Sequence, residues 1–351
     1  MKQIAWIISP PAKGSGGFRT ICSKASFLDS RGYENYFYIM PGCEAYKSAH
    51  RVQTEIKDWF GYSPKEVLVA PSVPEDFFAV IATAWNTAHF ASMQKCAHKF
   101  YFIQDFEPWF YPMGEMYLNA EASYRYELNP ITIGRWLSKK VEPYYSHEVP
   151  YCDFGVSDIY TAQEQNLSRE YAVCAIYQSN KDRRLSGMLL DAIKLLLKLD
   201  DAVVVYLYGE DAMPPIHDSR VRSLGILTAD ECASLYAKCV AGVSLSVTNP
   251  SRLPFEMLAS KLSVIEINRE NNLLDFPEGT IHLAEPSACG IASSILEALS
   301  GSKCDSPNRF SCTSIERENE MFFEAFTRYL NEEPSLASGK SAFGNVLKTE
   351  E

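Results

Sequence analysis

The sequence has no apolar run that approaches the roughly 20 residues of a membrane-spanning helix. The apolar residues 4–8 are followed by Pro10 and Pro11, and they form too short a run for the core of a signal peptide. These two absences predict a cytoplasmic location, with at most peripheral association with the inner face of the cell membrane.

Basic residues are also scarce, because 33 Lys and Arg stand against 44 Asp and Glu, a formal net charge of −11. Nucleic-acid binding needs clustered cations that neutralise phosphates, so a nucleic-acid partner is not expected. The one local basic segment, residues 135–140, could contact an anionic membrane surface. Its composition is equally that of a solvated helix face, which is the more common case.

Motifs for metal and cofactor chemistry are missing as well. The ten cysteines include no C-x-x-C pair, and the six histidines are dispersed. The sequence contains no G-x-x-x-x-G-K-[ST] loop, no H-E-x-x-H, no G-x-S-x-G and no D-x-D. We therefore expect mostly reduced, buried thiols, no metal site and no resident cofactor.

What the sequence does contain is a repeated alternation of strands and helices. Strand-like segments of the first series are residues 3–9, 36–40, 66–70, 79–84 and 100–104, with a first helix at 18–31. The second series has strands at 172–177, 202–208, 240–247 and 263–267, with helices at 185–199, 229–237 and 255–261. This pattern predicts an α/β fold with two domains, residues 1–158 and 159–312. We expect linker segments at 149–157 and 162–170, a helix at 313–331 that packs back on the first domain, and a flexible tail at 332–351.

The segment 248–260 joins one predicted strand to a helix and holds an acid in the turn. In an open α/β sheet such a loop lies at the carboxyl edge, where ligands bind. The backbone N–H groups of Ser251, Arg252 and Leu253 would have no intrahelical partner and could donate to a diphosphate. The carboxylate of Glu256 suits a sugar hydroxyl. Alternatively, Glu256 only charges the start of the helix.

A basic turn, residues 177–184, follows the first strand of the second series. Its cations are Lys181, Arg183 and Arg184. A guanidinium binds phosphate oxygens through two donors and stays charged as a leaving group develops, so this turn also fits a diphosphate. A solvated basic turn is the alternative.

Residues 102–110 place two carboxylates and an aromatic ring after a buried strand. Gln104, Asp105, Glu107 and Trp109 have the composition of a sugar-binding loop, and they predict contact with an acceptor sugar. Asp105 and Glu107 could instead form an acid/base pair for hydrolysis, or the loop could simply pack. Trp85, at another strand end, is expected to line the same cleft, unless it only packs.

A glycine-rich turn, residues 13–19, follows the first strand. It superficially resembles a dinucleotide-binding fingerprint, but the third glycine would fall at position 19, which is Arg19. We therefore expect Gly16 and Gly17 to belong to a loop that closes over a ligand at the interdomain cleft. A plain helix-starting turn is the alternative, and a nicotinamide or flavin site is the least favoured one.

Several separated blocks of the sequence together resemble one known family. They are residues 225–227, 235–239, 244–246 and 249–259 in the second half, and residues 82–85, 101–108, 111–112 and 129–136 in the first half. The second-half blocks are similar to the donor half of GT-B glycosyltransferases, and most of all to bacterial rhamnosyltransferases of the WsaF kind, within the large metal-independent retaining group. The first-half blocks resemble the acceptor domain of that family. The likeness covers about residues 1 to 300.

This resemblance implies two Rossmann-like domains that face each other across a central cleft. It implies that Glu256 binds the ribose of a nucleotide-sugar donor, that the backbone at 251–253 binds the diphosphate, and that Arg183 or Arg184 binds the phosphates. Gly225, Ile226 and Leu227 would contact the base, and Asn249 would line the donor site. The implied donor is dTDP-L-rhamnose, and the implied acceptor is a saccharide or lipid-linked saccharide of a bacterial surface polysaccharide.

The resemblance also implies roles in the reaction. The departing phosphate itself would take the acceptor proton, Arg184 would stabilise the leaving group, and Asp105 or Glu107 would orient the acceptor. Two positions depart from the wider group. Thr248 stands where a second Glu is usual, and Gln178-Ser179 stand where Arg-Pro is more frequent. Another nucleotide-sugar, or a non-catalytic sugar-binding or nucleotide-sugar-binding module, therefore remains an alternative, and a dehydrogenase is a distant one.

Overall fold

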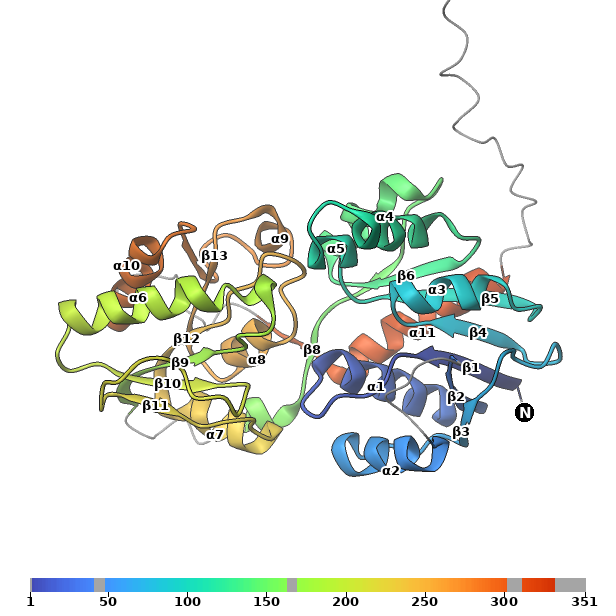
Figure 1. Ribbon diagram of the computed structural model, residues 1–351, viewed down its shortest axis with the longest axis horizontal. Coiled ribbons are helices and arrows are strands. Elements are labelled where there is room, and N and C mark those ends of the chain that lie inside the picture. Colours follow the sequence, from blue (N-terminus) through green and yellow to red (C-terminus); the bar gives the residue numbers. More distant parts are fainter. Residues whose placement is uncertain (1, 41–47, 163–168, 302–310, 332–351) are drawn as a thin grey trace, which may run out of the picture.

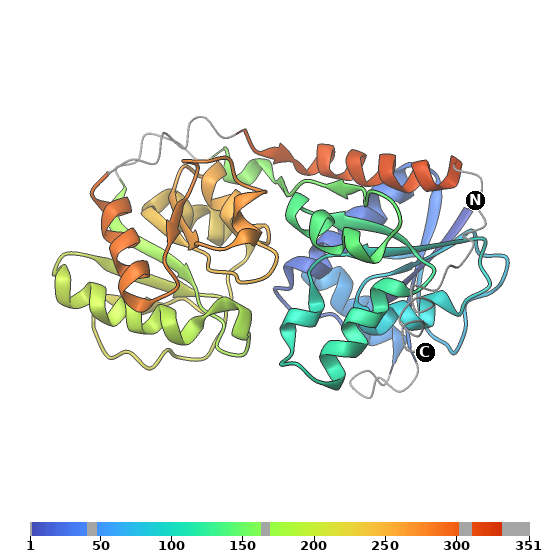
Figure 2. The ribbon, with the colours of Figure 1, turned by 90° about the horizontal axis from the view of Figure 1, so that it is seen from above.

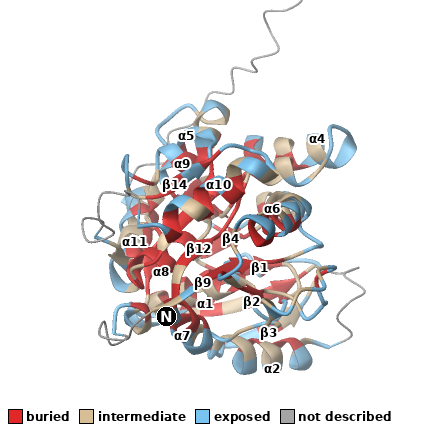
Figure 3. Ribbon diagram, turned by 90° about the vertical axis from the view of Figure 1, so that its left-hand side faces the viewer, coloured by how far each residue is buried: buried red, intermediate tan, exposed pale blue. Residues whose placement is uncertain are grey.

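Two parallel β-sheets, one in each half of the chain, organise this computed structural model, which describes residues 2–40, 48–162, 169–301 and 311–331 (Figure 1). Both sheets have helices on both faces. Buried residues concentrate in the strands and in helix α8, Leu253–Ala259, whereas the outer helices keep exposed faces (Figure 3). The expected α/β fold with two Rossmann-like units is confirmed.

The first sheet has seven strands in the order β3-β2-β1-β4-β5-β6-β7, all paired in parallel. The strands are β1 Lys2–Ile8, β2 Tyr33–Ile39, β3 Glu66–Val69, β4 Ala79–Ala82, β5 His98–Ile103, β6 Asn129–Ile133 and β7 Tyr151–Cys152. The helices are α1 Gly16–Ser30, α2 Ala49–Phe60, α3 Trp85–Ser92, α4 Glu115–Ala122 and α5 Arg135–Val141, with 3₁₀ turns η1 Glu107–Phe110, η2 Ser123–Arg125 and η3 Glu142–Tyr144. The strand order reverses between β1 and β4, and ligands bind at such a switch point in open α/β sheets.

The second sheet has six strands in the order β11-β10-β9-β12-β13-β14, also all parallel. The strands are β9 Glu170–Ile176, β10 Val204–Tyr208, β11 Val221–Ser223, β12 Cys239–Val243, β13 Ser263–Ile267 and β14 His282–Ala284. Around them lie η4 Asp158–Tyr160, η5 Asp182–Arg184, α6 Ser186–Leu199, α7 Ala229–Lys238, α8, α9 Glu270–Leu273 and α10 Ala288–Leu299. The order reverses between β9 and β12, so the basic turn after β9 and the loop after β12 leave the sheet side by side.

The alternation of side chains along β9 explains why this sheet is covered on both faces. Val173 and Ala175 lie in the cluster that contains α6 and α10, whereas Ala172, Cys174 and Ile176 lie in the cluster that contains α7 and α8. Successive residues of a strand point to opposite faces, so an uninterrupted apolar run is the expected pattern of a strand buried on both sides.

Several predicted boundaries are wrong by a few residues. The strand expected at 240–247 ends at Val243, and residues 244–252 form a loop that buries its polar groups. The predicted linker 149–157 carries the edge strand β7 and the short strand β8, Gly155–Val156. Most of the second expected linker, and the expected tail at 332–351, lie outside the described residues.

Helix α11, Ile315–Asn331, lies along the first domain although it follows the second in sequence (Figure 2). It is preceded by β15, Thr313–Ser314, which pairs with β8. Phe322 stacks on Trp6 with ring centroids 6.2 Å apart, and Phe326 packs on Phe100 at 4.6 Å. The chain therefore runs from the first domain to the second and back again.

A buried ionic cluster fastens this returning helix to both domains. Glu318 of α11 pairs with Lys24 of α1 at 2.6 Å and with Arg252, the residue before α8. The same carboxylate accepts the backbone N–H of Gly155 at 2.6 Å. Burial alone would raise the pKa of Glu318, but Arg252 and Lys24 together lower it to about 2. One carboxylate thus joins the first domain, the second domain and the C-terminal helix.

Replacing Glu318 should therefore destabilise the whole chain. In Glu318→Gln two cations stay in the interior without a counter-ion, and breaking a buried pair in this way costs about 3–5 kcal/mol. The folded-state pKa lies below the ordinary carboxyl value, so the stabilisation is fully present above pH 4.5 or so and is lost as the pH falls towards 2. Urea unfolding between pH 7 and pH 3 measures both effects.

Glu316→Gln is the matched control, because Glu316 lies on the same helix and is exposed. It should shift the free energy of unfolding by less than about 0.5 kcal/mol. If Glu318→Gln were as stable as this control at pH 7, the cluster would not hold the domains together.

Candidate functional site

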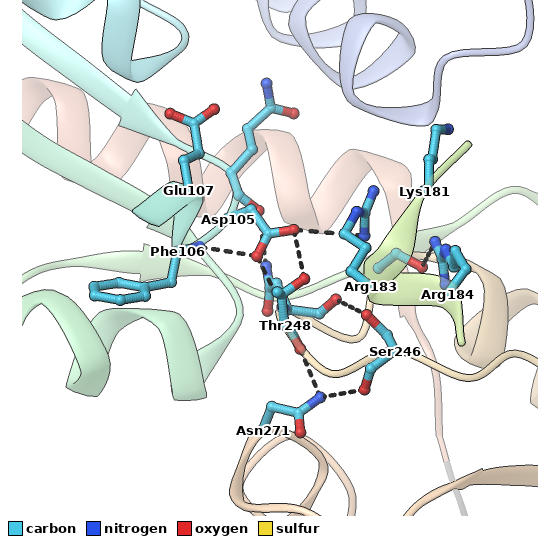
Figure 4. Close-up of polar contacts among 12 residues, drawn as sticks. Asp105, Phe106, Glu107, Lys181, Arg183, Arg184, Ser246, Thr248 and Asn271 are labelled. Carbon is cyan, nitrogen blue, oxygen red and sulfur yellow. Dashed lines mark hydrogen bonds and ion pairs between the residues drawn. The ribbon is translucent and has the colours of Figure 1, made fainter. Parts of the chain in front are cut away.

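The loops at the carboxyl edges of the two sheets meet at the seam between the domains. Gln104 and Asp105 follow β5 in the first domain, and Thr248 and Asn249 belong to the loop after β12 in the second (Figure 4). The side chain of Asn249 donates to the carbonyl oxygens of Gln104 at 2.9 Å and Ile133 at 3.0 Å. The predicted donor-binding and acceptor-binding segments therefore lie in direct contact.

Asp105 is the centre of this contact. Its Oδ1 accepts the backbone N–H groups of Phe106 at 2.8 Å and Asn249 at 2.9 Å, and its Oδ2 accepts the hydroxyl of Thr248 at 3.0 Å. Arg183 Nη1 lies 3.5 Å from Oδ2. Burial raises the pKa of Asp105, and the charge of Arg183 partly offsets that rise. Thr248, where the wider group usually has a Glu, thus binds a carboxylate that comes from the opposite domain.

Glu107 makes a separate set of contacts. Its Oε2 accepts the backbone N–H of Trp85, at the start of α3, and the hydroxyl of Tyr101 at 3.2 Å. Figure 4 shows its carboxylate pointing away from the partners of Asp105. Burial raises the pKa of Glu107 to about 8. The structure gives this carboxylate a role in holding the loops after β4 and β5 together, whereas the sequence groups it with Asp105 as a reacting residue.

The three predicted cations of the basic turn differ in their surroundings. Arg184 is buried, and it donates to the carbonyls of Ser244 and Leu245 at 3.3 Å and to Ser251 Oγ at 3.0 Å. Burial and the neighbouring Arg183 lower the pKa of Arg184 to about 10. Through these contacts its guanidinium stabilises the loop after β12. It therefore shapes the site and does not present its charge at the seam.

Arg183 and Lys181 are the cations that do face the seam region. The guanidinium of Arg183 lies over the ring of Phe110 at 5.5 Å. Lys181 is exposed and donates to Gln178 Oε1 at 3.1 Å. Partial desolvation of its ammonium group and the neighbouring charges of Arg183 and Arg184 lower the pKa of Lys181 to about 8. The part of this shift that comes from the two neighbouring cations is relieved when an anion binds.

Glu256 is paired with a residue to which the sequence analysis gave no role. Arg19 of α1 donates from Nη2 to Glu256 Oε1 at 2.7 Å, and Glu256 is 2% exposed. The charge of Glu256 raises the pKa of Arg19. Arg19 stands in the first turn of the helix that follows the glycine-rich loop. Its position in the loop after the first predicted strand was the signal that could have identified Arg19. The sequence analysis assigned a role only to the glycines of this loop.

The glycine-rich loop also approaches the loop predicted to contact a base. Gly14 has a φ of 76°, and a Cβ there would lie 3.2 Å from Ile226 Cγ2. The N–H of Ile226 donates to Asp211 Oδ1 at 3.2 Å, and Gly225 has a φ of 70°. A Cβ on Gly17 would lie 3.3 Å from Gln104 Oε1. The structure thus brings the loop 14–19 against both the donor-side and the acceptor-side segments, whereas a Cβ added to Gly16 would point into open space.

Two predicted residues lie elsewhere. The sequence places Arg252 among the donor-binding residues, but its side chain is buried in the ionic cluster with Glu318 and donates to Gly155 and Thr20. Only the backbone N–H of Arg252 could therefore bind the donor as predicted. Trp109 packs on Trp136 at 5.6 Å and under Lys140, outside the set of residues that meets Asp105. Trp85 Nε1 donates to the hydroxyl of Tyr111 at 3.1 Å.

Two buried residues of the second domain support the site and were not predicted. Glu266 of β13 accepts the hydroxyl of Ser244 at 2.7 Å and the N–H of Ser246 at 3.0 Å. Burial raises its pKa to about 8 despite the nearby charge of Arg184. Asn271 donates to the carbonyls of Ser246 and Thr248. An acid in an otherwise apolar strand was the signal that could have identified Glu266.

Two searches of the described part of the chain gave negative results. None of its helices is long and apolar enough to cross a membrane. Nor do its His, Cys, Asp and Glu residues gather into groups of three or more that could hold a metal ion.

Comparison with known proteins gives matches at three levels. Residues 172–296 match the family described as WsaF, C-terminal domain. The O-antigen biosynthesis protein RfbC of Myxococcus xanthus is 26% identical over 271 residues, which are 75% of this chain and 21% of that protein. The chain therefore spans about a fifth of the length of this relative.

Solved structures resemble the chain over nearly its whole length. HepE of Anabaena, crystallised with UDP and glucose, has a TM-score of 0.68 at 12% identity and covers 93% of this chain and 100% of its own. A glycosyltransferase of Rickettsia africae has a TM-score of 0.64 at 13% identity, with 95% and 99% coverage. The pneumococcal O-GlcNAc transferase GtfA, with UDP and GlcNAc, has a TM-score of 0.60 at 10% identity, with 94% and 99% coverage.

The matched segment 172–296 begins in β9 and ends in α10. It includes the basic turn, the loop after β12 and Glu256. At their low identities the solved structures establish the fold alone. The chain thus has the GT-B fold, and the part of its second domain from residue 172 to residue 296 is similar to the WsaF C-terminal domain.

Proposed function

We propose that the chain is a retaining, metal-independent glycosyltransferase that transfers L-rhamnose from dTDP-L-rhamnose to a saccharide acceptor in bacterial surface polysaccharide synthesis. One observation carries the proposal: the segment that matches the WsaF family is the segment that builds the basic turn and the Glu256 loop. The relative from Myxococcus is named for O-antigen biosynthesis, which supports the polysaccharide acceptor. Neighbours crystallised with UDP make a UDP-sugar the alternative donor.

In this proposal the donor lies against the second domain. Arg183 and Lys181 bind the diphosphate, helped by backbone N–H groups at 251–253, and they stabilise the charge that develops on the leaving phosphate. Arg184 keeps the loop after β12 in place through its contacts with Ser244, Leu245 and Ser251. Cations and N–H groups thus supply the stabilisation that a metal ion supplies in other transferases.

Asp105 orients the acceptor. The carboxylate already binds N–H and O–H donors from both domains, so a sugar hydroxyl can replace the hydroxyl of Thr248 when the seam opens. The departing phosphate oxygen takes the acceptor proton, the bond from the acceptor oxygen to the anomeric carbon forms on the face that the phosphate leaves, and the configuration is retained.

The pairing of Glu256 with Arg19 adds one requirement. Glu256 can bind the ribose of the donor only if one of its oxygens accepts a ribose hydroxyl, and Arg19 occupies Oε1 in this structure. We infer that the ribose hydroxyl takes the place of Arg19, so that donor binding exchanges an interdomain ion pair for hydrogen bonds to the nucleotide. A non-catalytic nucleotide-sugar-binding module would share this exchange but would not turn the donor over.

A thermal-shift screen with dTDP, UDP, GDP, ADP and NAD tests the donor. A nucleotide at about 100 times its Kd adds about 2.7 kcal/mol to the free energy of unfolding, which is a shift of several degrees in Tm. We expect dTDP to give the largest shift and Glu256→Gln to abolish it. Glu278→Gln, an exposed glutamate of the same domain, is the control and should keep it. If only UDP raised the Tm, the donor would be a UDP-sugar and not dTDP-L-rhamnose. If none of the nucleotides raised the Tm, the proposal would be contradicted.

Removing Arg19 should strengthen nucleotide binding. In Arg19→Ala the carboxylate of Glu256 no longer has to give up a 2.7 Å ion pair, so we expect the Kd for dTDP, measured by calorimetry, to fall by about three- to tenfold. In the Glu256→Gln background, where we expect dTDP binding to be lost, the same substitution should not restore it. A weaker Kd in Arg19→Ala would mean that Arg19 is itself a ligand of the nucleotide, and the exchange would be wrong.

Replacing Asp105 should slow turnover without weakening the binding of the donor. In Asp105→Asn the acceptor loses its charged hydrogen-bond partner, and we expect the rate of dTDP release from dTDP-L-rhamnose, with a rhamnose-terminated oligosaccharide as acceptor, to fall by about 100-fold. The Kd for dTDP should not rise, because Arg183 loses a counter-ion. Loss of donor affinity in this variant would contradict the assignment of Asp105 to the acceptor.

A further inference from the structure

A concave site lies in the first domain, beside the seam and outside the residues that are proposed to bind the donor. It is a pocket of about 320 Å³ between η1, α4, α5 and η3. Ligand pockets begin at about this size, roughly 300 Å³. Its lining residues are Phe106, Trp109, Tyr117, Lys139, Lys140, Pro143 and Tyr144.

The walls of the pocket are aromatic. Phe106 lies 5.3 Å from Trp109 and 6.4 Å from Tyr144, ring centroid to ring centroid. Trp109, Tyr117 and Tyr144 are half-buried, so parts of their surfaces face the pocket and solvent. Aromatic faces beside polar groups suit a pyranose ring, which has apolar C–H faces and a rim of hydroxyls.

The charged lining residues of this pocket are both cations. Lys139 pairs with Glu142 at 2.9 Å and Lys140 with Glu270 at 3.1 Å, and neither of these acids lines the pocket. The side chains of Lys139 and Glu270 are each 58% exposed, and such surface ion pairs contribute little. A ligand anion can therefore replace both acids at small cost, whereas a sugar ring that packs on these aromatic faces has to displace Lys140, which lies 4.2 Å from the ring of Trp109 and 5.4 Å from that of Phe106.

The pocket is joined to the site of Asp105 by one residue of backbone. Figure 4 shows the Asp105 carboxylate pointing towards Arg183 and the Phe106 ring pointing away from it. On η1, Trp109 faces Lys140 whereas Phe110 lies under Arg183. Lys140 also reaches across the seam to Glu270 of α9. A saccharide with one residue at Asp105 would thus place a neighbouring residue near this pocket.

We propose that this pocket is an acceptor subsite for a sugar that carries an anionic group, either a phosphate or a carboxylate. The aromatic walls hold the ring, and Lys139 and Lys140 bind the anion. This inference rests on the proposed function, because only a transferase would use the bound sugar as an acceptor. Binding of the sugar can be measured without donor turnover.

Calorimetric titration of the full chain with four probes tests the proposal. The probes are glucose 1-phosphate, glucuronate, methyl α-glucoside and inorganic phosphate. We expect glucose 1-phosphate or glucuronate to bind at least about tenfold more tightly than the neutral glucoside and than phosphate alone, since each contributes both ring and charge. Binding of the phosphosugar alone would identify a phosphate-bearing acceptor, and preference for glucuronate would identify an acidic sugar.

The double variant Lys139→Met/Lys140→Met should raise the Kd for the preferred probe at least about tenfold, and Trp109→Ala should do the same. Lys95→Met is the control, because Lys95 is an exposed, ion-paired lysine of the same domain, with Glu75 as its partner at 2.7 Å. The thermal shift with dTDP should persist in all three variants. Equal binding of the neutral glucoside, equal binding of phosphate alone, or unchanged binding in the lysine variant would each overturn the proposal. If the anionic sugar bound but none of the nucleotides did, the proposed transferase function would be contradicted, whereas the anionic-sugar site would be retained.

Discussion

The arrangement of the two domains depends on the carboxylate of Glu318, which joins both of them to the C-terminal helix. This carboxylate is fully buried and binds cations from α1 and from the residue before α8, while its own helix packs on the first sheet. A charge in the interior is tolerated only with its partners in place, so separating any of the three elements would expose or orphan an ion. The cluster therefore holds the back of the seam, and the loops that are proposed to bind the substrates lie at the front.

The front of the seam is assembled by topology more than by any local motif. Each sheet reverses its strand order once, and at each reversal two loops diverge and leave a crevice. In the second sheet these loops are the basic turn and the segment 244–252. In the first sheet they are the glycine-rich loop after β1 and the loop after β4, beside Asp105 after β5. Five short segments, distant in sequence, meet for this reason.

The sequence predicted the α/β fold correctly, and the segments that it proposed for the site do meet in the structure, because strands and strand ends leave local signals. Apolar runs such as residues 172–176 mark strands buried on both faces, and glycine and cation clusters mark strand ends. It could not predict which partner each charged residue has, because that depends on packing between domains. Arg252 belongs to the right loop, yet it turns back to Glu318. Arg19 and Glu266 gained importance only when folding placed them beside Glu256 and Arg184.

The charge pattern of the seam argues that this closed arrangement is one of at least two. Asp105 faces Arg183, and Glu256 faces Arg19, so these three proposed substrate-binding groups, Asp105, Arg183 and Glu256, already have partners from the opposite domain. These pairs keep the front closed while the cluster at Glu318 fixes the back. A donor that brings two phosphates and a ribose offers new partners to Arg183 and Glu256, and the exchange converts interdomain pairs into contacts with the ligand. The front can then open as a hinge about the Glu318 cluster without leaving a buried charge unpaired.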